Sequence, residues 1–264
     1  MKKLKENILY IYKMRYFWGY LARCDIIARN RRSKMGMLWI VVSPLTLTII
    51  MAVVLGTVFK MPIVEYVPYI QIGMIFWDLF VSSLVTGGGT FMGACPYIMQ
   101  YNHPLIIYTL KTAVVCTVNF MIASVGAYLW IAFTAPQNLL LGLITFPLTA
   151  ILMFSLSWSM TTVAAYINTK YRDYPQVMSL VTQAIWYMSP VFFQESMFQS
   201  NEILLTLFRL NPITHILYLQ RKPLINGELP SGWNYLFTVA FIAVFTLFAY
   251  LLNKKYRKKI IFYL

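Results

Sequence analysis

Residues 37–59 read MLWIVVSPLTLTIIMAVVLGTVF and contain no Asp, Glu, Lys or Arg. A helix that crosses the hydrocarbon core of a bilayer needs about 20 consecutive, predominantly apolar residues. The stretch therefore predicts a membrane-spanning helix, and the rest of the chain is interpreted around it.

Five further apolar stretches follow the first one. They cover residues 66–93, 105–133, 139–167, 176–194 and 233–253. Their only charged residues are Asp78 and Lys111. We therefore predict an all-α integral membrane protein with six transmembrane helices, folded as one domain over residues 1–264.

Basic residues gather at the two ends of the chain. Ten of the 22 Lys and Arg residues lie in positions 1–34, and five more lie in positions 254–264. Lys and Arg next to membrane spans are retained on the cytoplasmic side. The pattern predicts that both termini are cytoplasmic and that the chain is a multi-pass protein of a bacterial inner membrane.

Composition excludes several classes of function. The net charge is +14, but only 11% of the residues are charged and the basic ones flank apolar spans, so a nucleic-acid partner is not expected. The chain has no GxxxxGK[ST] phosphate loop and no HExxH motif, and its eight acidic residues form no evident pair for acid–base chemistry. We therefore predict no catalytic residue, no metal site and no cofactor bound by this chain.

Residues 11–32 differ from the spans because they interleave aromatic and basic side chains. This pattern is typical of an amphipathic helix that lies along the cytoplasmic membrane surface. The alternative is a basic topology signal without further role, and the sequence favours the interfacial helix.

A short polar island, residues 168–175, separates the fourth and fifth spans. Asp173 is placed to cap the following helix, with Pro175 near its first turn. The island is either a capped turn or a coupling element seated in a cleft of a partner. The residue types alone favour neither interpretation.

The external segment, residues 195–232, is long for a connector. Residues 201–210 and 214–220 predict two short helices, and Asn211-Pro212 predicts the turn between them. Such a pair is either a gate that dips into the outer leaflet or an ordered loop on the outer surface.

Short motifs occur in order along the chain. They are Gly36-Met37-Leu38-Trp39 followed by Ser43-Pro44, then Phe76-Trp77, Tyr171-Arg172-Asp173, Ser189-Pro190-Val191, Asn211-Pro212-Ile213-Thr214, and Arg221 followed by Leu224 and Gly227. The ordered set resembles the polysaccharide-export permeases, which are the membrane subunits of type-2 ABC exporters for O-antigen, capsule or teichoic acid. The O-antigen export permeases are the most similar. The loop Tyr101-Asn102-His103-Pro104 departs from the family pattern, which has an aromatic residue before the proline.

The resemblance implies a homodimeric permease with two copies of a separate ABC ATPase subunit, which would bind the ATP and Mg. The implied substrate is an undecaprenyl-linked glycan. The residues implied in ATPase coupling are Arg23, Asp25, Arg29, Arg31, Tyr101, His103, Tyr171, Arg172, Asp173 and Tyr174. The residues implied in an extracytoplasmic gate are Asn211, Pro212 and Arg221.

Aromatic side chains also indicate a glycan channel. Sugar rings stack their C–H faces on aromatic rings, and their hydroxyls need polar partners. The predicted channel residues are Trp39, Phe76, Trp77, Asp78, Trp158, Trp186 and Tyr187. The alternative for the aromatic rings is the interfacial belt of any membrane protein. Asp78 is expected in the protein interior, because it would cost about 2.5–3.5 kcal/mol at the centre of a lipid-facing helix.

The glycines Gly87-Gly88-Gly89 predict close helix packing or a helix break. For the whole chain, the favoured function is the membrane subunit of an ATP-driven polysaccharide exporter. The alternatives are a type-2 exporter of drugs or lipids, an integral-membrane acyl- or glycosyltransferase, and, less favoured still, a structural scaffold.

Overall fold

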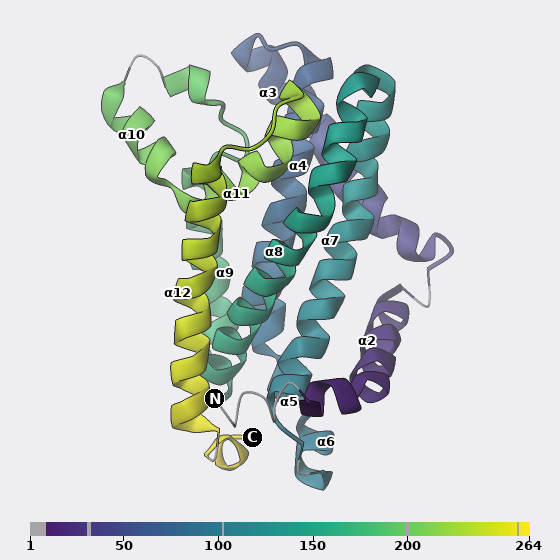
Figure 1. The fold of residues 1–264 in the computed structure, drawn as a ribbon, viewed down its shortest axis with the longest axis vertical. Coiled ribbons are helices and arrows are strands. Elements are labelled where there is room, and N and C mark those ends of the chain that lie inside the picture. Colours follow the sequence, from purple (N-terminus) through teal and green to yellow (C-terminus); the bar gives the residue numbers. More distant parts are fainter. Residues whose placement is uncertain (1–8, 31–32, 102, 199–200, 258) are drawn as a thin grey trace.

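The computed structural model describes residues 9–30, 33–101, 103–198, 201–257 and 259–264, and within them the regular structure is helical (Figure 1). The α-helices are α2 (Arg15–Asn30), α3 (Trp39–Phe59), α4 (Ile63–Val81), α5 (Thr90–Gly93), α6 (Cys95–Gln100), α7 (Ile106–Thr134), α8 (Pro136–Lys170), α9 (Tyr174–Met188), α10 (Glu202–Leu210), α11 (Pro212–Arg221) and α12 (Gly232–Tyr256). Shorter 3-10 or π segments are η1 (Gly36–Leu38), η2 (Ser82–Thr86), η3 (Glu195–Phe198), η4 (Lys222–Asn226) and η5 (Ile260–Phe262). The predicted all-α class is confirmed.

Among the described residues, five helices are long and apolar enough to cross a membrane. They are Gly36–Phe59, Ile63–Thr86, Ile106–Thr134, Pro136–Lys170 and Gly232–Tyr256. The predicted span at 176–194 instead forms the shorter α9, which has 15 residues and ends at Met188. At 1.5 Å per residue α9 is about 22 Å long, less than the roughly 30 Å of a hydrocarbon core.

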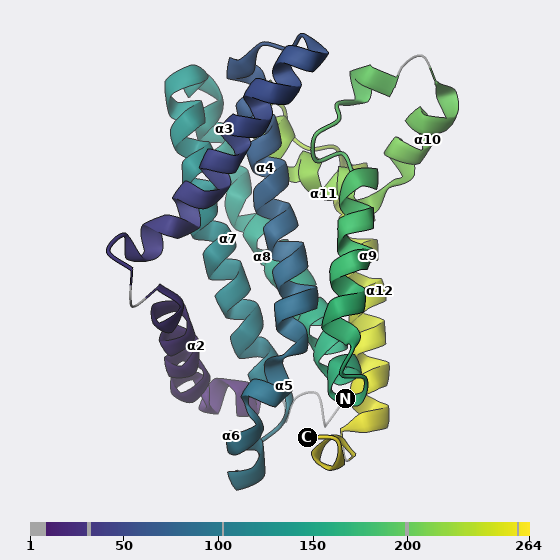
Figure 2. The same ribbon diagram turned by 180° about the vertical axis from the view of Figure 1, so that it is seen from behind.

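The helices form one upright bundle with α4, α7 and α8 near its centre (Figures 1 and 2). The most apolar window of the second span is 61% buried, whereas those of the first and last spans are 11% buried. The outer surfaces of α3 and α12 are therefore left for lipid or for another protein. The N-terminal helix α2 lies beside the bundle, near the end at which α12 stops.

Several hydroxyl side chains inside the bundle form hydrogen bonds within it. Thr117, Thr149 and Ser83 each donate a hydrogen bond to the carbonyl four residues earlier in the same helix. The Ser83 and Ser157 hydroxyls are also hydrogen-bonded across α4–η2 and α8, with 2.7 Å between the oxygens. Hydroxyls that are satisfied in this way permit close helix packing without placing free donors in hydrocarbon.

Glycines end the second span where α4 approaches α8 and α9. A Cβ on Gly87 would lie 2.9 Å from the Thr161 hydroxyl, and one on Gly88 would lie 3.0 Å from the Tyr174 ring. The π segment η2 precedes them and α5 begins at Thr90. Both parts of the glycine prediction, close packing and a helix break, are confirmed, and the span predicted to reach residue 93 ends earlier.

Two short helices, α10 and α11, precede the last span, where the sequence predicts a helix pair. The Asn201 side chain accepts hydrogen bonds from the backbone N–H groups of Ile203 and Leu204 at the start of α10. The Asn211 side chain accepts one from Ile213 at the start of α11, where Pro212 occupies the first turn. Figure 1 shows α10 and α11 at the end of the bundle opposite the C-terminus.

Candidate functional site

One face of the second span carries polar residues at every fourth position. Asp78 and Thr86 are exposed, and Ser82 between them is half-buried. Residues four apart lie on the same side of a helix. A charged residue on such a face is costly against lipid, about 2.5–3.5 kcal/mol for Asp at the bilayer centre, so this face is better suited to water or to a polar ligand.

A second polar stripe runs along α9. Gln176, Ser179, Gln183 and Tyr187 are spaced by three or four residues, and all four are exposed. Helix α9 contacts both α4 and η2, so the two stripes lie on neighbouring helices. Figure 2 shows α4 and α9 together on the near side of the bundle. We call these two stripes the α4–α9 polar face.

Two of the predicted channel residues lie on this face, and others adjoin it. Asp78 and Tyr187 belong to the stripes, and Tyr187 is in ring contact with the half-buried Trp186 at 5.3 Å between centroids. Trp77 is half-buried and stacks on Phe80 at 5.5 Å. Trp39 is exposed on α3, and its indole donates a hydrogen bond to the Ser33 hydroxyl.

The other two predicted channel residues, Phe76 and Trp158, contact α7. Phe76 is buried and meets Phe120 edge-to-face, with 5.0 Å between ring centroids. The Trp158 indole donates to the Thr109 hydroxyl of α7 at 3.2 Å. The predicted channel does not include Ser82, Thr86, Gln176 and Ser179, although their three- and four-residue spacing within apolar segments is visible in the sequence.

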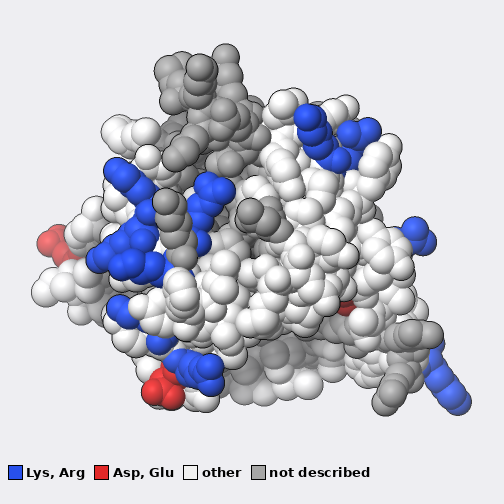
Figure 3. All heavy atoms as spheres, turned by 90° about the horizontal axis from the view of Figure 1, so that it is seen from below, with Lys and Arg blue, Asp and Glu red and all other residues white. Residues whose placement is uncertain are grey.

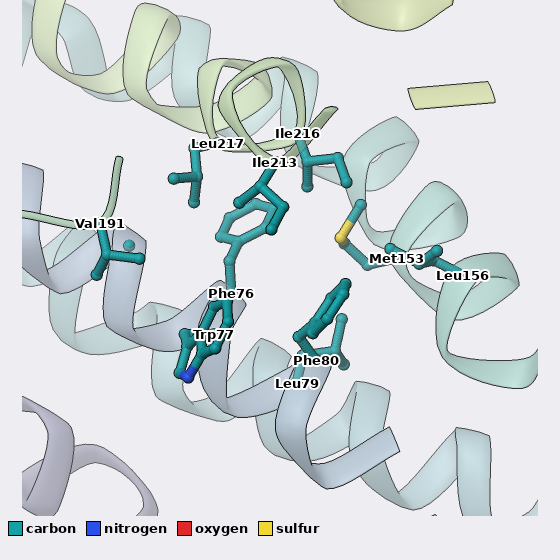
Figure 4. A pocket seen from close by; sticks show the side chains of 11 residues that line it. Phe76, Trp77, Leu79, Phe80, Met153, Leu156, Val191, Ile213, Ile216 and Leu217 are labelled. Carbon is teal, nitrogen blue, oxygen red and sulfur yellow. The ribbon is translucent and has the colours of Figure 1, made fainter. Parts of the chain in front are cut away.

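A small cavity lies beneath α11 (Figure 4). Its lining is Gly73, Phe76, Trp77, Leu79, Phe80, Met153, Leu156, Val191, Ile213, Ile216 and Leu217. A hydroxyl-rich ligand would lose its hydrogen bonds in such a lining, which costs free energy. The cavity is therefore a packing space under α11 rather than a sugar site.

Arg221, a predicted gate residue, is fully buried at the end of α11. Its guanidinium donates to the Tyr69 carbonyl through Nε and Nη2, to the Pro190 carbonyl through Nη1, and to the Val191 carbonyl through Nη2. It also lies 3.5 Å from the centroid of the Tyr69 ring. A buried charge needs partners of this kind, so Arg221 joins α11, α4 and the chain that follows α9.

The segment after α9 is no longer helical, so its backbone carbonyls accept hydrogen bonds from side chains. Besides Arg221, the Tyr66 hydroxyl donates to the Phe192 carbonyl at 2.8 Å. The Tyr69 hydroxyl donates to the Phe193 carbonyl at 2.7 Å. Non-helical backbone at membrane depth is tolerated only where protein or water satisfies it. We call residues 189–193 with Tyr66, Tyr69 and Arg221 the carbonyl clamp.

The opposite end of the molecule, which we call the basic end, holds α2 and the last turns of α8 and α12. Lys111, the charge predicted near the start of the third span, is ion-paired with Asp25 of α2. Arg23 on the same helix is exposed. Arg29 also belongs to α2, and Arg31 lies outside the described residues.

The predicted first coupling loop contacts the N-terminal region through aromatic rings. His103 Nδ1 is hydrogen-bonded to the Tyr10 hydroxyl at 2.8 Å, and its ring stacks on Tyr101 at 5.6 Å. Phe17 of α2 lies 5.4 Å from the same imidazole. The structure thus brings the predicted coupling loop at Tyr101 and His103 against the N-terminal helical region, although Tyr10 and His103 are 93 residues apart in the chain.

The polar turn between α8 and α9 presents most of its side chains outward. Tyr171, Arg172 and Asp173 are exposed, while Tyr174 is buried. Asp173 occupies the N-cap position of α9, but its side chain makes no capping hydrogen bond. The predicted side-chain cap is therefore wrong. The backbone of Asp173 is in the right-handed helical region at φ −80°, ψ −3°, and not in the extended conformation usual at a cap. Pro175 does lie in the first turn, as predicted.

The Asp25–Lys111 pair gives a testable expectation for α2. Replacing Lys111 with Met should remove the ion pair and loosen α2 from α7. The expected result is faster chymotrypsin cleavage at the exposed Tyr12, Tyr16 and Tyr20 in detergent. Lys34→Met, at an exposed position without a salt bridge among the described residues, is the control. Equal cleavage rates in both variants would contradict the anchoring role.

Comparison with known proteins places this geometry in a functional context. The chain is 23% identical over 255 residues to the O-antigen export system permease protein RfbA of Klebsiella pneumoniae, covering 93% of this chain and 97% of that protein. A second Klebsiella pneumoniae RfbA is 23% identical over 230 residues, covering 82% and 86%. The RfbA of Myxococcus xanthus is 22% identical over 240 residues, covering 90% and 91%.

No protein-family model matches the chain. The resemblance to O-antigen export permeases that the ordered motifs indicate is confirmed, and it extends over most of the chain. Together with the five apolar helices, it describes a multi-pass membrane protein similar to transport permeases.

Proposed function

We propose that this chain is the membrane subunit of an ABC exporter that moves a lipid-linked polysaccharide, of the O-antigen or capsule type, across a bacterial inner membrane. The observation that carries the proposal is the α4–α9 polar face. It places a carboxylate, amides, hydroxyls and an aromatic ring on the outside of helices that are otherwise apolar. Similarity to O-antigen export permeases supports the substrate class.

One polar face does not enclose a path, so the functional unit is a homodimer. Two copies that turn their α4–α9 faces toward each other would line a water-filled passage between them. Amide and hydroxyl groups would bind sugar hydroxyls, and Tyr187 would supply a ring for C–H faces. Burying Asp78 in that passage removes the cost of exposing its charge to lipid.

In this arrangement α9 completes the sixth crossing, although it is short for a span. Its 15 residues are continued by residues 189–193, whose carbonyls are satisfied by the carbonyl clamp. Six crossings place both termini on one side. The concentration of Lys and Arg at the basic end makes that side cytoplasmic.

The energy source is a separate ABC ATPase, two copies of which bind ATP and Mg beneath the dimer. Its docking surface would combine α2, the loop at Tyr101 and His103, and the exposed turn Tyr171–Asp173. Helix α9 begins directly after that turn and ends at the carbonyl clamp. A displacement of the turn would therefore reach the α10–α11 gate through one rigid helix.

The test replaces polar side chains of the α9 stripe with apolar side chains of similar size. Gln176→Leu/Gln183→Leu should leave the protein in the membrane but lower surface polysaccharide at least about tenfold, because the sugar hydroxyls lose their partners. Immunoblots of surface polymer and of cell-retained polymer measure the effect. Leu180→Met, at an exposed apolar position of the same helix, is the matched control.

Three outcomes decide the proposal. Loss of surface polymer together with accumulation of lipid-linked glycan inside the cell supports it. Normal polymer export in the double variant excludes the α4–α9 polar face as the path. A normal glycan pool in cells that lack the protein would favour an exporter of another substrate instead.

A further inference from the structure

Two membrane helices bring their basic ends around one tyrosine. Helix α8 ends at Lys170 and α12 ends at Tyr256, and the two helices pack against each other. Lys170 Nζ lies 5.5 Å from the centroid of the Tyr256 ring, and Lys255 Nζ lies 5.4 Å from it. Two ammonium groups from distant parts of the chain therefore share one aromatic neighbour.

This cluster carries positive charge without a carboxylate partner in the part of the chain that is described. Lys254 and Arg257 are exposed beside the two lysines and add to it. The ion pairs among the described residues are Lys111–Asp25 and Arg209–Glu195, and neither belongs to the cluster. Figure 3, which views this end of the molecule, shows many more Lys and Arg than Asp and Glu side chains.

An apolar surface lies immediately next to the cluster along α12. Leu247, Phe248, Tyr250 and Leu251 are exposed in the two turns that precede Lys254. The most apolar window of α12 is only 11% buried within the protomer. A ligand that fits both surfaces has an anionic head and a hydrocarbon tail.

We propose that Lys170 and Lys255, which both lie against Tyr256, bind the phosphate headgroup of an anionic phospholipid together with the exposed Lys254 and Arg257 on the same end of α12. The ammonium and guanidinium groups donate to phosphate oxygens, and the acyl chains lie along α12. Basic clusters between membrane helices bind anionic headgroups in this manner. The location of that lipid in the cytoplasmic leaflet rests on the proposed orientation, but the binding itself does not.

An acidic surface of a protein partner is the competing occupant, and the position of the cluster argues against it. The basic groups stand at the level where two membrane helices end, with lipid-accessible side chains directly adjoining them. Phospholipid occupancy at Lys170 would also place a headgroup beside the turn Tyr171–Asp173.

Native mass spectrometry of the purified full-length protein tests the inference. The protein is titrated with phosphatidylglycerol or with phosphatidylcholine of the same acyl chains. We expect preferential retention of phosphatidylglycerol, and we expect Lys170→Gln/Lys255→Gln to weaken it about 25-fold. Lys13→Gln/Lys34→Gln, which removes the same charge elsewhere on the exposed surface, should weaken it much less.

Each alternative result overturns the site. Equal weakening by both double variants would mean that only net charge matters. Unchanged phosphatidylglycerol retention in Lys170→Gln/Lys255→Gln, combined with loss of the co-purifying ATPase, would identify a protein-docking surface. If the double variant does not fold, Lys255→Gln alone carries the same expectation at about fivefold. Export is not measured here, so failure of the proposed function leaves this test intact.

Discussion

Arg221→Met is expected to lower the stability of the folded protein by about 3–9 kcal/mol, because three buried carbonyl oxygens lose a donor at roughly 1–3 kcal/mol each. These are the carbonyls of Tyr69, Pro190 and Val191. Methionine retains the length of the side chain but supplies no hydrogen bond. For a chain of this size, 1 kcal/mol shifts the melting temperature by about 2–4 °C. Thermal melts followed by size-exclusion chromatography in detergent should show the drop.

Arg209→Met is the matched control for this change. Arg209 lies on the neighbouring α10, is exposed, and forms an ion pair with Glu195 at the surface. Pairs of that kind contribute about 0–1 kcal/mol, so the melt should move little. Gly73→Val tests the same junction from the other side, because a Cβ there would lie 2.7 Å from Arg221 Nη2. A melting temperature for Arg221→Met within about 2 °C of wild type would show that water replaces the lost donors.

Arg172→Ala/Asp173→Ala is expected to leave assembly and melting unchanged while lowering polysaccharide export at least about tenfold, the loss of roughly 1.4 kcal/mol of coupling. Both side chains are exposed, and neither forms a salt bridge among the described residues. Their proposed role is contact with the ATPase at the start of α9. ATP hydrolysis by the purified complex should lose its dependence on substrate along with export.

The control for the coupling variant changes one positive and one negative side chain at the opposite end. Lys60→Asn/Glu65→Gln alters two exposed residues, and Asn tolerates the left-handed backbone of Lys60 at φ 53°. This variant should retain export and ATP hydrolysis. Wild-type export by Arg172→Ala/Asp173→Ala would mean that the turn Tyr171–Asp173 has only a structural role.

Local signals in the sequence predicted the regular elements well. Of the six apolar segments predicted to span the membrane, five form helices of spanning length among the described residues, and the short helices predicted at residues 201–210 and 214–220 correspond to α10 and α11. Each of these features depends on residues close together in the chain. The predicted cap at Asp173 failed because its backbone lies in the right-handed helical region and not in the extended conformation usual at a cap.

The candidate site depended more on packing than on composition. Phe76 and Trp158 looked equivalent to Tyr187 as aromatic channel residues, yet they face α7 and Tyr187 faces outward. Which side of a membrane helix is buried is weakly encoded, because lipid and protein interior are both apolar. The polar stripe of α9 indicates the non-lipid face more strongly than the aromatic residues do, because placing an amide in lipid costs more free energy than placing an aromatic ring there.

The sequence by itself determined that the chain is a helical membrane protein, where most helices run, and which permeases it resembles. Hydrophobic length, charge bias and ordered motifs are one-dimensional properties, so they are readable without coordinates. Only the tertiary structure showed that Arg221 binds carbonyls 152, 31 and 30 residues away, and that Lys170 and Lys255 meet at Tyr256. Such contacts arise when helices distant in sequence pack together, because a buried charge or a freed carbonyl binds whichever partner that packing places beside it.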